Sequence, residues 1–98
     1  MANHFGEKIR NLREAKHLLQ RQVAEKIEID AALLCKIERG ERKAKKDQVL
    51  SFAKLFKIQK EMLLTLWLAD KVYDLIKDEE MATAALKVAE SQYSYKPK

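Results

Sequence analysis

Cationic side chains gather around one short segment, IDAALLCKIERGER, which runs from Ile29 to Arg42. Asp30 and Gly40 bracket it, as a side-chain cap and a left-handed stop bracket a short helix. Lys and Arg donate charged hydrogen bonds to phosphate oxygens, so these cations could bind a polyanion; alone, they could equally form an idle solvated surface. The candidate phosphate-binding residues are Arg21, Arg39, Arg42, Lys43, Lys45 and Lys46.

Residues for catalysis or metal binding form no recognisable pattern. His4 and His17 have no nucleophile or metal-ligand motif near them, and the chain has no glycine-rich phosphate loop. Cys35 is the only cysteine, which excludes an internal disulfide and a zinc site built from cysteines. We interpret it as a small packing residue, with a redox-sensing or metal-sensing thiol as the alternative. We therefore expect no catalytic activity, cofactor or metal.

Charged residues are distributed unevenly along the chain, which the net charge of +5 does not show. Residues 1–60 contain fifteen Lys and Arg against eight Asp and Glu, whereas residues 61–98 contain five against seven. The first part is therefore expected to present a basic surface to a polyanion, and the second part to have a different role.

Length and composition favour one helical domain. Ninety-eight residues can form one modest core, and two Gly and one Pro leave few signals for turns between strands. No apolar run is long enough to span a membrane, and the sequence does not begin with a signal peptide. We therefore expect an all-α, soluble, cytoplasmic protein.

Apolar residues at helical spacing predict six helices. Phe5, Ile9 and Leu12, for example, repeat at i, i+4 and i+7. Asp30 and Asp47 are expected to cap the third and fourth helices. With these caps included, the predicted ranges are residues 3–16, 20–27, 30–39, 47–56, 60–78 and 79–92.

The second and third predicted helices are short and joined by a tight turn, which is typical of a helix-turn-helix. The segments LREAKHLLQRQVAEKI and IDAALLCKIERGER resemble the Cro and phage-repressor-like (Xre-type) family of bacterial helix-turn-helix regulators. Spacing fits from Leu12 through Gly40 without a gap, and the likeness covers residues 5 to 60. The resemblance implies a five-helix, lambda-repressor-like domain that binds double-stranded DNA.

Several residues take roles from this resemblance. Arg13 and Glu38 match an ion pair that ties the first helix to the recognition helix, and Gln20 matches a phosphate contact. The family usually has Gly near His17 and in the turn where this chain has Glu28. Glu28 must then adopt a positive φ, or the turn must differ slightly.

The family's geometry also implies which residues face the bases. The outward positions at the start of the recognition helix are Ala31, Ala32 and Leu33, with Lys36 one turn further along. Small apolar side chains can contact the thymine methyl group, and Lys can donate to guanine O6 and N7 or to a phosphate. We expect the recognition helix to make few base contacts and the protein to take the rest of its specificity from DNA shape.

The second part of the chain has more apolar surface than packing on the first part can bury. We interpret residues 1–60 as the DNA-binding domain and residues 61–98 as a helical extension, packed on the first part, that forms a homodimer. A two-fold dimer would present two recognition helices to an inverted-repeat operator. The predicted dimerisation residues are Leu63, Leu66, Trp67, Tyr73, Ile76, Ala84 and Val88.

These features favour a dimeric, sequence-specific transcription regulator that is nucleoid-associated when bound to DNA. The extension resembles those of small regulators found with restriction-modification genes, so we expect a repressor or a restriction-modification controller. The alternative is a protein-interaction module, such as an antitoxin whose C-terminal helices neutralise a toxin. A homodimer with salt-sensitive operator binding would favour the regulator, and a monomer with an exposed apolar groove would favour the module.

Overall fold

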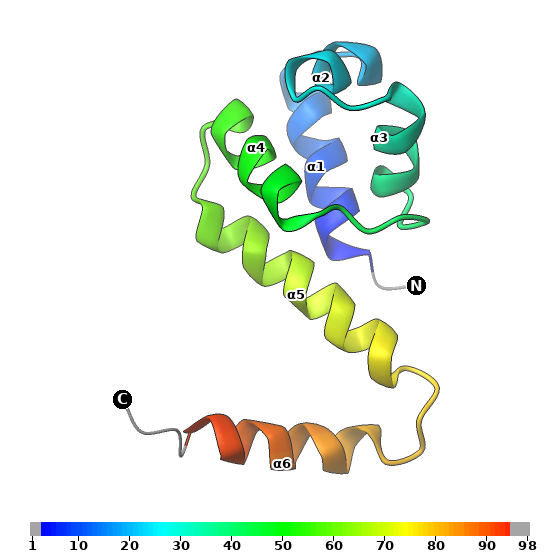
Figure 1. The fold of residues 1–98 in the computed structure, drawn as a ribbon, viewed down its shortest axis with the longest axis vertical. Helices are drawn as coiled ribbons and strands as arrows, with labels where there is room; N and C mark the ends of the chain where they lie inside the picture. Colours follow the sequence, from blue (N-terminus) through cyan, green and yellow to red (C-terminus); the bar gives the residue numbers. More distant parts are fainter. Residues whose placement is uncertain (1–2, 95–98) are drawn as a thin grey trace.

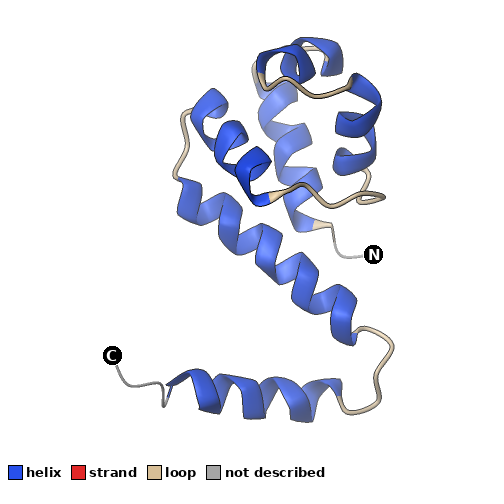
Figure 2. Ribbon diagram, viewed as in Figure 1, coloured by secondary structure: helices blue, strands red, loops and turns tan. Residues whose placement is uncertain are grey.

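A computed structural model describes residues 3–94, which form six helices (Figure 1). The helices are α1 (His4–Ala15), α2 (Gln20–Lys26), α3 (Ala31–Glu38), α4 (Lys46–Phe56), α5 (Lys60–Ile76) and α6 (Ala82–Ser94). Figure 2 shows that this part of the chain contains no strand. The all-α prediction is therefore confirmed, and every predicted helix is present with ends that shift by a few residues.

The core lies between α1, α2, α3, α4 and the first half of α5, which we call the bundle. Phe52 of α4 packs edge-to-face against Phe5, with 5.9 Å between ring centroids, and is stacked with Phe56 at 6.4 Å. The other buried apolar side chains are Ile9, Val23, Ala24, Leu34, Ile37, Ala44, Val49, Ala53, Leu63 and Trp67. Because every helix of the bundle contributes to one core, the orientation of α3 is fixed by packing.

The start of α1 lies very close to the end of α3. A Cβ atom at Gly6 would collide with the carbonyl oxygen of Ile37, so glycine is needed for this approach. Asn3 Nδ2 donates a hydrogen bond to the carbonyl oxygen of Glu38 at 2.8 Å, which satisfies one of the orphan acceptors at the end of α3. The C-terminal end of α3 is thereby held on α1.

The two predicted aspartate caps do not form as expected. Asp30 occupies the N-cap position of α3, but its carboxylate makes no capping hydrogen bond. Helix α4 begins before Asp47, at Lys46, so its N-cap is Lys45 and the prediction for Asp47 is wrong. The physical reason is Gln48, because its Oε1 accepts the N–H of Lys45 at 2.8 Å and secures the start of the helix there.

Among residues 3–94, three non-glycine residues adopt left-handed backbone conformations at helix ends, namely His17 (φ 56°), Glu28 (φ 60°) and Lys57 (φ 55°). Glu28 thus takes the positive φ that was one of its two expected alternatives, at a cost on the order of 1 kcal/mol. The isoleucines on either side of Glu28 pack against the core and hold the turn in place. Gly40, with φ 78°, ends α3 as predicted.

The first half of α5 belongs to the same core as α1 and α4. Leu63 and Trp67 are buried there, so their predicted role in dimerisation is wrong, because burial within one chain leaves them no surface for a partner. The cause is that α5 is apolar around most of its circumference, and spacing alone cannot tell which face meets the core. Leu66 and Ile76 are half-buried, and Tyr73 is exposed.

Helix α6 lies apart from the bundle, beyond the far end of α5 (Figure 1). None of its residues is buried, and the predicted dimerisation residues Ala84 and Val88 are exposed. The core therefore continues across the predicted division at residue 60, and burial ends within α5, where Asp70 is the last buried residue of the described part of the chain. None of the helices within residues 3–94 combines the length and the hydropathy that a membrane crossing requires.

Candidate nucleic-acid interface

A charged cluster joins α1, α2 and the end of α3. Arg13 and Glu38 form a two-pronged ion pair, with 2.8 Å between Nε and Oε2 and 3.1 Å between Nη2 and Oε1. Arg13 Nη1 also donates to the carbonyl oxygen of Leu18 at 2.9 Å. Hydrogen bonding to Glu38 raises the pKa of the Arg13 guanidinium, although burial opposes this effect. Because Glu38 is 5% exposed, the pair ties α3 to α1 from within the protein.

The side chain of Gln20 belongs to the same cluster. Its Nε2 donates a hydrogen bond to Glu38 Oε1 at 3.0 Å. One N–H of this amide is therefore used inside the protein, and the predicted phosphate contact would have to use the other. Arg21, the next residue along α2, is exposed.

The outward face of α3 carries three of the four predicted base-reading residues. Ala31, Ala32 and Lys36 are exposed, whereas Leu33 is half-buried and packs against the core, so it is the least available of the four. Ala32 and Lys36 are one helical turn apart, and Arg39 follows at the C-cap of α3. These last three residues share one face of the helix, which we call the outward line.

Residues 41–46, from the end of α3 to the first residue of α4, extend this basic surface, and we call them the basic loop. Arg42, Lys45 and Lys46 are exposed, and none of them forms an ion pair within the described part of the chain. Arg39 pairs with Glu41 at 3.0 Å, but both side chains are exposed. Such a pair contributes at most about 1 kcal/mol and can yield to a competing anion.

Residues 4–66, well over half of the chain, match a family model described as a helix-turn-helix domain. The chain belongs to the helix-turn-helix domain family. This membership is consistent with the Xre-type resemblance and supports a DNA-binding regulator in general terms. No curated protein and no solved structure matches the chain. The matched region of the helix-turn-helix domain begins with α1 and ends within α5, so it contains the charged cluster, the outward line and the basic loop.

Lys43 differs from the other cations of the basic loop, because its Nζ pairs with Asp74 Oδ2 on α5. The hydrogen bond from Lys43 is the main cause that lowers the pKa of Asp74, and burial opposes this effect. Lys77 Nζ lies 3.7 Å from Asp74 Oδ1 and adds to the lowering. The predicted phosphate-binding residue Lys43 thus has a carboxylate partner within the helix-turn-helix protein.

Sequence reasoning missed two further contacts of α5. Trp67 Nε1 donates a hydrogen bond to the carbonyl oxygen of Ala44 at 2.7 Å, which anchors the basic loop. Asp70, 2% exposed, accepts the backbone N–H groups of His4 at 3.0 Å and Phe5 at 2.9 Å, and so caps α1. Signals were present for both contacts, since a buried indole N–H needs an acceptor and an Asp buried within an apolar helix needs donors.

Cys35 is half-buried and lines a hollow of about 240 Å³ together with Arg13 and Arg39. Within residues 3–94, no group of three or more His, Cys, Asp or Glu side chains could hold a metal ion. The interpretation of this thiol as a packing residue stays a prediction.

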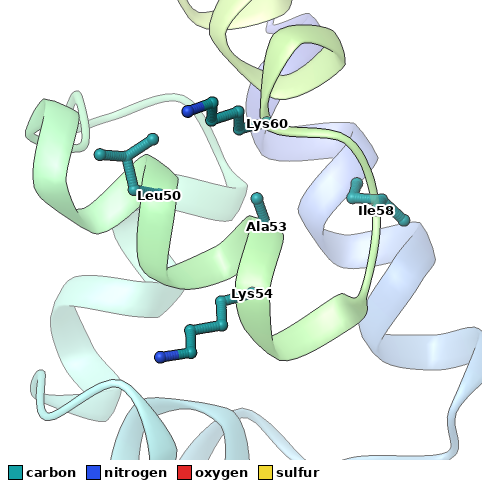
Figure 3. A pocket seen from close by; sticks show the side chains of 5 residues that line it. All are labelled: Leu50, Ala53, Lys54, Ile58 and Lys60. Carbon is teal, nitrogen blue, oxygen red and sulfur yellow. The ribbon is translucent and has the colours of Figure 1, made fainter.

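An open hollow of about 370 Å³ lies between α4 and the start of α5 (Figure 3). Its lining residues are Leu50, Ala53, Lys54, Ile58 and Lys60. None of them lies on α2, on α3 or in the basic loop, so this hollow is separate from the candidate nucleic-acid interface.

Proposed function

We propose that the protein is a sequence-specific transcription regulator that binds an inverted-repeat operator in double-stranded DNA as a homodimer. The observation that carries the proposal is the outward line of α3, which continues into the exposed cations of the basic loop. Small side chains at the start of α3 allow close approach to base edges, while the cations reach phosphates on either side of the groove. The proposed activity is binding, without catalysis.

The small residues of α3 are proposed to read thymine. Ala31 and Ala32 have no donor or acceptor, and the thymine methyl group is the feature of a base edge that suits them. Leu33 would contribute only its exposed edge, and Lys36 would donate to guanine or to a phosphate. Apart from Lys43, which is paired with Asp74, the predicted phosphate contacts are all proposed here, namely Gln20, Arg21, Arg39, Arg42, Lys45 and Lys46.

Dimerisation is proposed through α6 and the second half of α5. Leu68, Val72 and Leu75 are exposed along one side of α5. An isolated helix of 13 residues, the length of α6, is marginal in water, so its amphipathic pattern supports packing against a second copy. The apolar stripe of α6, at i, i+3, i+4, i+7 and i+11, consists of Ala82, Ala85, Leu86, Ala89 and Tyr93. The other candidates, retained from the sequence, are Leu66, Tyr73, Ile76, Ala84 and Val88.

The proposed role is that of a repressor or of a restriction-modification controller, and it rests on the resemblance of the C-terminal extension. The genes beside this one test it. A neighbouring endonuclease and methyltransferase pair would support the controller, and its absence would leave the repressor.

Selection from a random pool of DNA duplexes, followed by binding measurements at several salt concentrations, tests DNA recognition. We expect an inverted repeat, with log K falling linearly with log salt by about 0.9 per phosphate contact. Lys46→Ala should weaken binding to all duplexes alike, whereas Lys36→Ala should cost about 1–3 kcal/mol at one operator position. Failure to select any sequence, with no salt dependence, would overturn the proposal.

Deoxyuridine in place of single operator thymines tests the reading of methyl groups, because it removes the methyl and keeps the hydrogen-bonding groups. One or two positions in each half-site should lose about 0.8 kcal/mol, the value of burying one such carbon. Ala31→Gly or Leu33→Ala should abolish the effect at the matching position. If no position responds, specificity rests on Lys36 and DNA shape.

The exposed apolar surface of α5 and α6 also favours a second candidate, a protein-interaction module such as an antitoxin. In that case the surface would be covered by a different protein. A monomer in light scattering at micromolar concentration, together with no selected operator, would favour this candidate over the regulator.

A further inference from the structure

The basic loop is attached to α5 at two adjacent residues. Trp67 Nε1 holds the carbonyl oxygen of Ala44 at 2.7 Å, and Asp74 pairs with the ammonium group of Lys43. Trp67 and Asp74 are seven residues apart on α5 and therefore share one face of that helix. The same face carries Asp70, which caps α1. One face of α5, with Trp67, Asp70 and Asp74, thus holds both the basic loop and the N-terminus of α1.

Lys43 is placed differently from its neighbours in the loop. Lys45 and Lys46 are exposed and free of ion pairs within residues 3–94, whereas Lys43 reaches along α5 to a carboxylate. A carboxylate offers an ammonium group the same kind of anionic oxygen as a DNA phosphate does. The backbone beside Lys43 is anchored through a buried hydrogen bond at Ala44, so the partner of the Lys43 ammonium group is set by its side chain and not by movement of the loop.

We propose that Asp74 takes the place of a DNA phosphate and withholds Lys43 from the DNA, so that Lys43 positions the basic loop and makes no phosphate contact. This inference rests on the proposed function, since it concerns which cations of the DNA-binding surface reach the backbone. Asp74 and Trp67 are positioning residues, because they act on the DNA contact through the loop. Within the basic loop, Lys45, Lys46 and Arg42 supply the phosphate contacts.

Because the Lys43–Asp74 pair is partly exposed, either residue can be substituted without disturbing the core. The Lys43 and Asp74 side chains are 36% and 38% exposed, so neither is needed to fill the core and both can be replaced without a cavity. Lys77, 3.7 Å from the same carboxylate, cannot fully replace Lys43 at the loop, because it lies one turn along α5 itself. Removal of Asp74 should therefore leave Lys43 as an unpaired cation beside the other loop cations.

The test measures the salt dependence of duplex binding for the full-length protein and four variants, Lys43→Ala, Asp74→Asn, the double variant and Asp78→Asn. Lys43→Ala should keep the wild-type slope of log K against log salt. Asp74→Asn should bind more tightly and steepen the slope by about 0.9, the value of one added phosphate contact. The double variant should return to the wild-type slope. Asp78→Asn removes the same charge from an exposed residue nearby and should leave the slope unchanged.

Two results would overturn the inference while leaving the proposed function intact. A slope that falls by about 0.9 in Lys43→Ala would show that Lys43 contacts a phosphate in the complex. Equal slopes for Asp74→Asn and Asp78→Asn would show that Asp74 does not compete with DNA. A wild-type protein with no salt-dependent binding would instead overturn the proposed function and the inference with it. Circular dichroism of each variant checks the fold, and Lys43→Gln repeats the test if Lys43→Ala unfolds.

Discussion

The bundle and α6 differ in how far their side chains are packed and hydrogen-bonded within the chain. Within residues 3–94, every buried polar side-chain atom has a hydrogen-bond partner, and the carboxylates of Glu38 and Asp70 both bind groups of the bundle. In α6 no residue is buried, and Val88 and Tyr93 are 58% and 78% exposed. The bundle is therefore complete within one chain, whereas the apolar stripe of α6 has no partner within residues 3–94.

The difference gives the two regions different sources of stability. The bundle combines an apolar core with ion pairs and caps that fix α3 relative to α1. A helix as short as α6 gains most of its stability from packing of its apolar face, so its helical state depends on what covers that face. One region can present a rigid surface to DNA, and the other is suited to joining a second copy.

Loss of Glu38 should affect the bundle most. Glu38→Ala leaves the guanidinium of Arg13, whose side chain is 13% exposed, without its carboxylate, and Gln20 without its acceptor. We expect the free energy of unfolding to fall by about 3 kcal/mol in urea denaturation. Glu14→Ala breaks the exposed pair with Arg10 and should cost less than about 1 kcal/mol. Equal costs for the two substitutions would show that burial of the charged cluster does not matter.

Removal of the Asp70 charge, which caps α1, should lower the free energy of unfolding by less than loss of Glu38 does. Asp70→Asn replaces one of two acceptor oxygens with an amide NH₂ that faces a backbone N–H, either that of His4 or that of Phe5. The expected loss is about 1–2 kcal/mol in the free energy of unfolding. Asp78→Asn, at an exposed position on α5's C-terminal side, is the matched control. A cap that contributes nothing would give the same unfolding curve for both variants.

The smallest expected effect is the pH-dependent contribution of the Lys43–Asp74 pair to the free energy of unfolding. The hydrogen bond from Lys43 lowers the pKa of Asp74, so the pair stabilises the folded state above the ordinary carboxyl pKa of 3.8. This contribution is lost as the pH falls through the lowered pKa, because the carboxyl is then protonated in both states. The difference in unfolding free energy between wild type and Lys43→Ala should be constant near neutral pH and shrink below about pH 4. A difference that persists at pH 2 would assign it to contacts other than the ion pair.

Helix positions could be predicted from the sequence because apolar spacing reports directly on the face of a helix that meets the core. The charged cluster was accessible only through the family resemblance, since residues 13 and 38 are distant in sequence and nothing local links them. Glu28 shows a limit of local rules, because packing of its neighbours holds a backbone conformation that its own side chain disfavours.

The roles within α5 could not be separated from the sequence. Its apolar residues surround most of the helix, so spacing placed Leu63 and Trp67 in the predicted dimer surface, although both belong to the core. The contacts of Asp70 and Asp74 join segments that are distant in the chain, and neither residue lies in a recognisable motif. Only the tertiary arrangement shows which carboxylate caps a helix and which one pairs with the basic loop.

Removal of residues 79–98 tests the division between the two regions most directly. The truncated chain keeps the whole bundle, because α6 buries none of its residues. We expect it to bind a single operator half-site with the affinity and salt dependence of the full chain. It should be monomeric in light scattering at micromolar concentration and should lose the preference for an inverted repeat over a half-site. A truncated chain that remains dimeric and keeps this preference would contradict the proposed need for α6 in dimerisation.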